Sequence, residues 1–235
     1  MLRNKDTEAP MLPLMLAVAG LFAPASAPAA TVLLWDNGPF HTGNGISLVQ
    51  DLSLGLTTLG FNHSDASSQR VADDFEAYCR CGTRLDLAEF FAYQTGSTSA
   101  STFDTVRVQV WSGRPDDPGS VVLGGDLTTN RFGASAFNHV YRQTESGPSS
   151  NMRPIMTVTA SINVVVPPGA AWIEWQTGGM LASGPWAVPI TILGQAATGN
   201  GRHFDGSAWV DAKDAGLQTQ QGFPFRLYGA CQPCP

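Results

Sequence analysis

The chain has 235 residues, of which 43% are hydrophobic and 14% are charged, and its net charge is −6. This balance excludes a charge-rich disordered chain and a coiled coil. Lysine occurs only at Lys5 and Lys213, so the basic stripe of a nucleic-acid-binding protein is missing and no nucleic-acid partner is expected. The composition indicates an acidic β protein rich in glycine and aromatic residues, and the sequence itself specifies no activity.

The N-terminal segment has the order of a secretory signal peptide. Arg3 and Lys5 precede an apolar stretch from Met11 to Phe22, and small residues follow it. Four prolines in this segment argue against a buried helix. We therefore expect residues 1–29 to be removed by cleavage before Ala30. Residues 30–235 would then form one secreted or periplasmic domain without a membrane span.

Four cysteines support export. Cys79, Cys81, Cys231 and Cys234 are an even number, which in an oxidising compartment predicts two disulfides. Cys79 and Cys81 would share one face of a strand, which disfavours a bridge between them. We therefore expect both to pair with Cys231 and Cys234, in either order. The alternatives are a zinc site of four thiolates and a redox role for Cys231-Gln-Pro-Cys234.

The remaining sequence consists of short β-favouring runs separated by clusters of Gly, Pro, Asn and Asp. Strands are predicted at 31–35, 70–78, 85–93, 105–111, 120–123, 156–166, 171–176 and 221–229. The run 85–93 also suits a helical stripe, but Leu85, Leu87, Phe91 and Tyr93 alternate as in a strand, with Glu89 as the exception. Loops are expected at 95–102, 144–151 and 194–206. So many short strands predict a two-layer antiparallel β-sandwich, jelly-roll-like, with a closed barrel as the alternative.

Six short phrases are spread along the expected domain: Trp35-Asp-Asn-Gly-Pro39, Gly60-Phe-Asn62, Val71-Ala-Asp-Asp-Phe75, Ala92-Tyr-Gln-Thr-Gly-Ser97, Val108-Gln-Val-Trp-Ser-Gly113 and Arg153-Pro-Ile-Met156. Together they resemble a family of uncharacterised bacterial secreted proteins with a β-sandwich domain. Members of that family often carry sorting or anchoring tails, whereas this chain has a cysteine-rich tail. The resemblance implies a secreted sandwich and supplies no catalytic residues.

Catalytic signatures are missing from the sequence. Neither Gly-x-Ser-x-Gly nor His-Glu-x-x-His occurs, and the four histidines lack the spacing of metal ligands. We therefore predict no cofactor apart from a structural calcium ion.

Acidic residues in turns and in one apolar run suggest where such an ion would bind. Calcium takes six to eight oxygen ligands, many from turns. Asp73 and Asp74 lie within an apolar run, where one of them must face inward or pair. The candidate ligands are Asp36, Asn37, Asp73 and Asp74, with Asn62 and Asp65 in similar turns. The alternative is that Asp73 caps a turn or pairs with Arg70 or Arg107.

Glu174 lies between two tryptophans, Trp172 and Trp175, as a carboxylate does in many sugar sites. Strand alternation predicts that Trp175 and Ile173 are buried while Trp172 and Glu174 lie on the other face. Candidate ligand-binding residues are Trp172, Glu174, Trp186 and Trp209. A glycosidase would need a second carboxyl about 5–9 Å from Glu174, and Glu89 or Asp73 is the candidate. In the alternative interpretation Trp172 is half-exposed and Glu174 is simply solvated.

Three functions follow from these observations. The first is an exported, non-catalytic β-sandwich module that binds a glycan or another cell-surface or extracellular ligand. The second is a hydrolase or lyase that acts on a polysaccharide through paired carboxylates. The third is a purely structural envelope protein.

Overall fold

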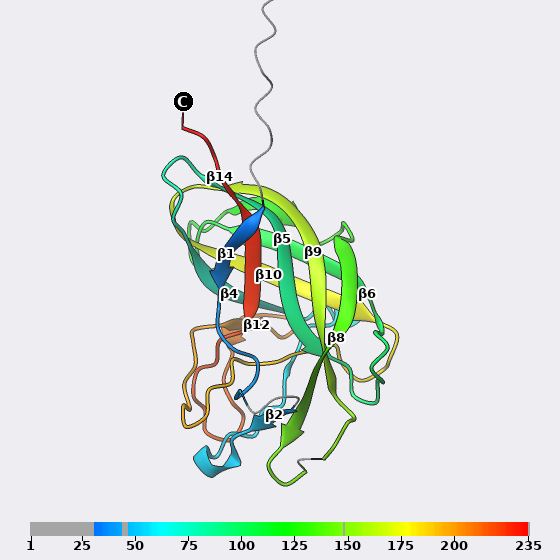
Figure 1. Cartoon of the computed structure of the whole chain (residues 1–235). Helices are drawn as coiled ribbons and strands as arrows, with labels where there is room; N and C mark the ends of the chain where they lie inside the picture. Colours follow the sequence, from blue (N-terminus) through cyan, green and yellow to red (C-terminus); the bar gives the residue numbers. More distant parts are fainter. Residues whose placement is uncertain (1–30, 44–46, 148, 235) are drawn as a thin grey trace, which may run out of the picture.

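The computed structural model describes residues 31–43, 47–147 and 149–234, and strands dominate this part of the chain. Two sheets pack face to face, and long connecting segments extend beyond one end of them (Figure 1). The fold is thus the predicted all-β sandwich. The predicted signal peptide lies outside the described residues. None of the helices in the described part is long and apolar enough to cross a membrane.

The larger sheet has eight strands, in the order β1-β14-β5-β9-β8-β2 with β11 and β3 attached beside β5. Its pairs are antiparallel except that β2 runs parallel to β8. Its strands are β1 (Val32–Asp36), β2 (Ser47–Gln50), β3 (Phe61–Asn62), β5 (Thr83–Tyr93), β8 (Phe132–Thr144), β9 (Pro154–Val166), β11 (Trp186–Ala187) and β14 (Phe225–Cys231).

The smaller sheet has six strands, in the order β13-β12-β4-β10-β6-β7, all antiparallel. Its strands are β4 (Arg70–Ala77), β6 (Phe103–Trp111), β7 (Val122–Asp126), β10 (Gly169–Gly179), β12 (Arg202–Phe204) and β13 (Trp209–Asp211). Two 3-10 turns complete the elements, η1 (Leu52–Leu54) and η2 (Asp65–Ser67). Because β4, β5 and β6 alternate between the sheets, the connections resemble those of a jelly roll.

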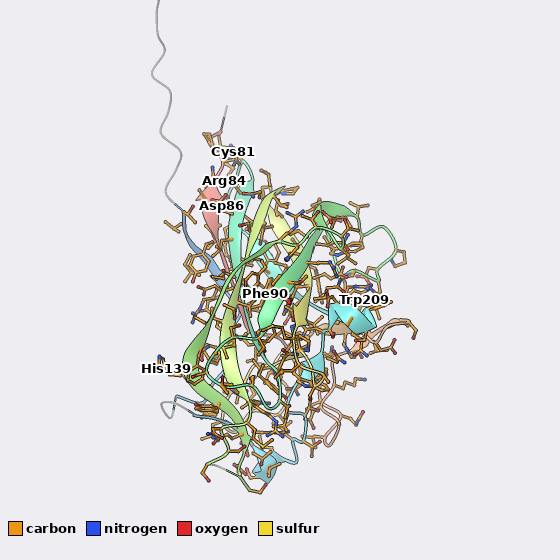
Figure 2. All side chains as sticks on the ribbon, turned by 90° about the vertical axis from the view of Figure 1, so that its right-hand side faces the viewer. Cys81, Arg84, Asp86, Phe90, His139 and Trp209 are labelled. Carbon is orange, nitrogen blue, oxygen red and sulfur yellow. A yellow bond between two sulfur atoms is a disulfide. The ribbon has the colours of Figure 1, made fainter. Side chains whose placement is uncertain are left out.

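The main core lies between the sheets and is built from alternate residues of the facing strands. Its centre is an aromatic stack, in which the rings of Phe90 on β5 and Trp175 on β10 lie 4.5 Å apart. Phe223 and Phe225 pack around the same indole, with ring centroids 5.9 Å from it. These contacts join the two sheets across the full thickness of the sandwich. Figure 2 shows Phe90 near the middle of the molecule, with Cys81 toward one end and Trp209 at one side.

A second, smaller apolar cluster lies on the outer face of the larger sheet. It contains Phe40, Phe91, Tyr93, Val140, Ile155 and Val188, with Leu59 and Trp186 packed against it. β5 is therefore covered on both faces near its end, which explains why its sequence also suited a helix.

The expectation that Leu85 and Phe91 share a face is wrong. A β-bulge between Leu85 and Leu87 shifts the register, so Leu85 faces the core while Phe91 faces the second cluster.

Two disulfides tie the turn between β4 and β5 to the C-terminal segment. Cys79 bonds to Cys231 and Cys81 to Cys234, at sequence separations of 152 and 153 residues. The prediction of two long-range bridges is confirmed, and no thiol remains for a zinc site or redox chemistry among the four. On the chain-entropy model, closing loops of this length stabilises the fold by about 4–5 kcal/mol.

Most of the predicted strands are present, with boundaries shifted by a few residues. Six strands were not foreseen, namely β2, β3, β8, β11, β12 and β13. β8 lies in a stretch to which no structure was assigned, and β12 lies inside the expected loop 194–206. Each pairs both with the next strand along the chain and with a strand distant in sequence, β2 for β8 and β4 for β12.

Candidate functional site

The two faces of β10 differ as predicted, but both are covered. Ile173 and Trp175 face the main core, with exposed fractions of 0% and 2%. Trp172 points to the outer face of the smaller sheet, yet its exposed fraction is only 7%. The interpretation of Trp172 as half-exposed is therefore wrong, and it is not an open stacking platform for a sugar.

Glu174 is buried rather than solvated, with an exposed fraction of 1%. Its carboxylate accepts hydrogen bonds from Nε of Arg70 and from Nε1 of Trp111, the latter at 2.7 Å. The Arg70 guanidinium in turn lies 3.9 Å from the ring centre of Phe204. Burial raises the pKa of Glu174, and the adjacent Arg70 opposes that rise. These contacts occupy Glu174 in a structural ion pair.

The loop between β6 and β7 explains why this face is closed. Asp116 in that loop forms an ion pair with Arg202 on β12. Arg202 lies opposite Ala72 on β4, which lies opposite Glu174 on β10, so these three residues share the outer face. The ion pair therefore draws the loop across the outer face of β10 and β4.

Glu89 and Glu174 cannot form a catalytic pair. Each immediately precedes a core residue, Phe90 and Trp175 respectively, so alternation turns the two carboxylates outward from opposite sheets. With the sheets about 10 Å apart, the carboxyls are separated by roughly 20 Å. Glu89 instead accepts a hydrogen bond from the Tyr228 hydroxyl at 2.9 Å.

Asp73 is no better a partner for Glu174, since it points into the sandwich from β4, with an exposed fraction of 1%. It accepts hydrogen bonds from Nδ2 of Asn37 (3.1 Å) and the backbone N–H groups of Phe223 (2.6 Å) and Asp74 (3.0 Å). Burial raises the pKa of Asp73 well above its usual value, although the backbone donors oppose this.

The residues named as calcium ligands do not converge. Asp74 lies on the opposite face of β4 from Asp73, and Asp36 pairs with Arg226. Asn37 approaches Asp73 but presents its amide nitrogen, a donor that repels a cation. Within the described ranges, no three His, Cys, Asp or Glu side chains gather as a metal site would require. A calcium ion elsewhere in the fold stays a prediction.

Trp209 is half-buried at the edge of the smaller sheet (Figure 2). Its ring packs edge-on against Phe204 at 5.5 Å, and the Arg70 guanidinium lies 5.7 Å from its centre. Trp209 therefore belongs to the same packed group as Glu174 and Trp172.

Trp186 is the remaining tryptophan candidate, and it lines two hollows of ligand size. β11 pairs with β3 and β5, which places Trp186 opposite Asn62 and Tyr93. Directly opposite residues share a face, so all three project from the outer face of the larger sheet. The half-buried indole packs against the second apolar cluster and separates two surface hollows.

We call these the serine hollow and the arginine hollow. The serine hollow has a volume of about 480 Å³, and its polar walls come from Asn62, Ser64, Ser67 and Ser183. The arginine hollow has a volume of about 420 Å³, and its polar walls come from Thr58, Tyr93, Thr95 and Arg153. Both volumes lie within the range of small-ligand sites, and both contain hydroxyl groups beside one indole.

Two glycines position the indole. A Cβ atom at Gly60 would come within 3.0 Å of the Trp186 Cβ, and one at Gly184 within 2.4 Å of its Cδ1. Gly184 also has a φ of +91°, a conformation that favours glycine. The stretch Gly184-Pro-Trp186 therefore requires glycine both for its backbone and for the space that the indole occupies.

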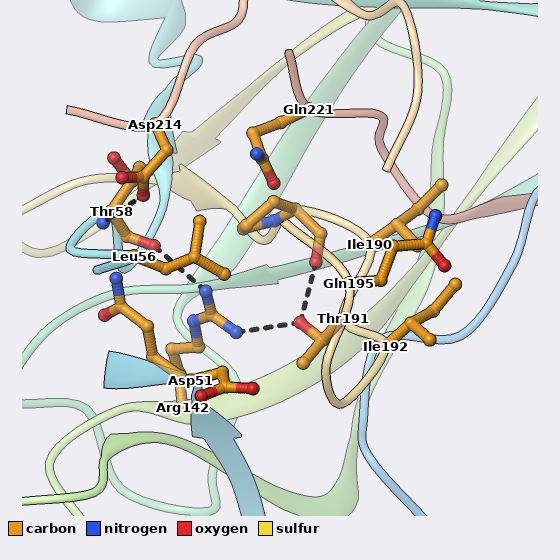
Figure 3. A pocket seen from close by; sticks show the side chains of 12 residues that line it. Asp51, Leu56, Thr58, Arg142, Ile190, Thr191, Ile192, Gln195, Asp214 and Gln221 are labelled. Atoms are coloured by element: carbon orange, nitrogen blue, oxygen red, sulfur yellow. Dashed lines mark hydrogen bonds between the residues drawn. The ribbon is translucent and has the colours of Figure 1, made fainter. Parts of the chain in front are cut away.

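A small cavity lined by the buried Arg142 lies on the other side of Thr58, which also lines the arginine hollow (Figure 3). Arg142 donates to the carbonyls of Leu59 (2.7 Å) and Thr58 (3.0 Å) and to Thr191 Oγ1 (3.0 Å). Burial lowers its pKa to about 10, so it stays charged at neutral pH. The cavity beside it measures about 20 Å³, room for one water but not for a sugar. Its role is thus to hold the Thr58–Leu59 backbone.

Comparison with family models, with curated proteins and with solved structures finds no match to this chain. The resemblance to a secreted bacterial family therefore stays a prediction. The class is defined by the fold alone, as a disulfide-stapled β-sandwich protein.

Sequence reasoning missed Tyr93, Arg142 and Arg153 as parts of the site region. They lie on three different strands or strand ends and meet only through the sheet order β5-β9-β8. A usable signal was present at Gly184-Pro-Trp186, because a turn that sets a tryptophan next to glycine indicates a fixed, partly exposed ring.

Proposed function

We propose that this chain is an exported, non-catalytic β-sandwich module that binds a glycan across Trp186. The main support is the half-buried Trp186 indole, which lies between two hollows lined by hydroxyl and amide groups. A sugar ring has an apolar face that stacks on an indole and hydroxyls at its edge that hydrogen-bond to such groups. Because Gly60 and Gly184 leave the Trp186 side chain closely packed, it loses little conformational freedom when a ligand binds, which favours binding.

Export to the periplasm or the exterior belongs to the same proposal. Two disulfides are compatible with an oxidising compartment and support it. N-terminal sequencing of the protein recovered outside the cytoplasm should begin at Ala30. Recovered protein that still begins at Met1 or Met11 would contradict this part.

Catalysis receives less support than binding. The separation of Glu174 from Glu89, and the inward orientation of Asp73, leave the named carboxylates without a common substrate position. Release of reducing ends from polysaccharides incubated with the protein would instead support the hydrolase or lyase hypothesis.

A glycan array followed by calorimetry on the oxidised protein tests the proposal. Trp186→Ala should weaken binding by roughly 30-fold, about 2 kcal/mol, as expected for a central tryptophan. Trp209→Ala is the matched control, because it removes another half-buried tryptophan from the opposite sheet, and it should bind normally. An array without any bound glycan, or equal losses for the two variants, would contradict the proposal and favour a structural envelope protein.

A further inference from the structure

The arginine hollow has a positive character that the rest of this acidic chain does not share. Arg153 lines it, and none of its lining residues is acidic. The whole chain, by contrast, carries a net charge of −6. A cation in a hollow beside an indole is therefore a local feature to be explained.

Arg153 is one of few described arginines that lack a carboxylate partner. The ion-paired arginines of the described chain are Arg70, Arg84, Arg107, Arg114, Arg131, Arg202 and Arg226. Three described arginines make no such pair. Of these, Arg142 is fully buried and bound to carbonyls, Arg80 lies in an exposed turn, and Arg153 is half-buried in the hollow.

The buried Arg142 adds to the positive potential around Arg153. Arg142 and Arg153 both lie close enough to Tyr93 to favour its ionised form, but burial outweighs them and raises the pKa of Tyr93 to about 12. The phenol therefore keeps its proton and can donate a hydrogen bond at neutral pH.

Asp214, the residue before the lining residue Ala215, already has hydrogen-bond partners for its carboxylate. Asp214 accepts hydrogen bonds from the backbone N–H groups of Thr57, Thr58, Gly216 and Leu217. The carboxylate is thus held by the backbone turn; it favours the charged form of the buried Arg142 and makes no ion pair with Arg153. A guanidinium binds a carboxylate through two parallel hydrogen bonds, a geometry that suits a planar acid group on a ligand.

Building on the glycan-binding function proposed above, we propose that the arginine hollow selects an acidic sugar. The uronate carboxylate binds to Arg153, the sugar ring stacks on Trp186, and the Tyr93 hydroxyl donates to a ring substituent. The serine hollow, which has no charged lining residue, takes the adjacent sugar through hydroxyl and amide contacts.

Paired ligands provide the test. Oligomers of galacturonate, mannuronate and glucuronate are titrated into the oxidised protein, each beside its methyl ester, which removes only the charge. We expect at least one acid form to bind about tenfold or more tightly than its ester, with an advantage that shrinks as salt rises. Arg153→Gln should erase this preference while leaving the ester affinity unchanged.

Arg80→Gln is the charge-matched control. It also removes an arginine without an ion pair, near the disulfides at the opposite end of β5 from Tyr93. It should retain the full preference for the acid form. An acid preference that survives in Arg153→Gln, or that falls equally in Arg80→Gln, would overturn the assignment of the carboxylate site.

The remaining outcomes separate this inference from the proposed function. If acid and ester bind equally well and both lose affinity in Trp186→Ala, the acidic preference is refuted while glycan binding at Trp186 is supported. Binding only of neutral glycans on the array would do the same. Failure of all acidic and neutral glycans to bind would overturn both.

Discussion

Replacing Trp175 by alanine probes the aromatic stack that joins the two sheets. The side chain has an exposed fraction of 2%, and its ring contacts Phe90, Phe223 and Phe225. Truncating a buried tryptophan costs about 3–5 kcal/mol, and each lost aromatic pair adds roughly 0.5–1.5 kcal/mol. We therefore expect Trp175→Ala to lose about 5 kcal/mol, a large part of the stability of a typical domain.

The assay is urea unfolding followed by far-ultraviolet circular dichroism, with the disulfides kept oxidised. For a domain of about 200 residues, a loss of 5 kcal/mol also lowers Tm by about 10–20 °C. The denaturant slope should stay unchanged, since only the native packing is altered. Trp175→Phe, which keeps a ring in the stack, should lose less than half as much.

Trp186→Ala serves as the comparison, because that indole is half-buried at the surface. Its loss of stability should be below half that of Trp175→Ala. If Trp175→Ala costs less than about 1.5 kcal/mol, or no more than Trp186→Ala, the stack does not hold the sheets together as described.

Three further changes test the packed groups. Glu174→Ala leaves Arg70 without its partner and should cost about 2–4 kcal/mol in urea unfolding. Asp86→Ala, at a more exposed ion pair, should cost less than about 1 kcal/mol. Equal costs would contradict the buried pair. Burial raises the pKa of Asp73 in the folded protein above its usual 3.8. The protonated carboxyl therefore contributes stability that is fully present below pH 3.8. This contribution is lost as the pH rises through the folded pKa. The stability of Asp73→Asn relative to the parent should therefore improve between pH 4 and 8, and a flat difference would show that Asp73 is ionised throughout. Gly184→Ala should lower the free energy of unfolding by about 1–3 kcal/mol because of the positive φ at this position. It should also weaken glycan binding, because the added Cβ displaces the Trp186 indole. Unchanged affinity would show that binding does not depend on this position of the indole.

The sequence was most informative where one local pattern decided the structure. Alternation assigned Ile173 and Trp175 to the core, and the spacing of Cys79 and Cys81 indicated long-range bridges. Alternation cannot show what covers the other face. Trp172 is buried on the face where Asp116 of the β6–β7 loop pairs with Arg202, and an ion pair between residues so far apart in sequence leaves no periodic trace.

The candidate site was predictable only in part for a related reason. Trp186 was named from its residue type, but its neighbours Tyr93 and Arg153 come from strands that meet through sheet pairing. The bulge in β5, where two residues pass for one on β14, also puts Phe91 on the face opposite to Leu85. Pairing partners and bulges are set by the tertiary fold, which a single sequence pattern does not encode.

The two disulfides also determine how the protein responds to mechanical load. They close residues 79–231 into a covalent ring, so tension along the backbone passes through the bridges and does not reach the strands inside. At about 3.4 Å per residue, the 152-residue span hides roughly 500 Å of contour length. A stretched chain would release that length only after reduction. Both core sheets contribute most of their strands to this shielded ring, so even strong pulling on an oxidised molecule should leave the sandwich largely intact.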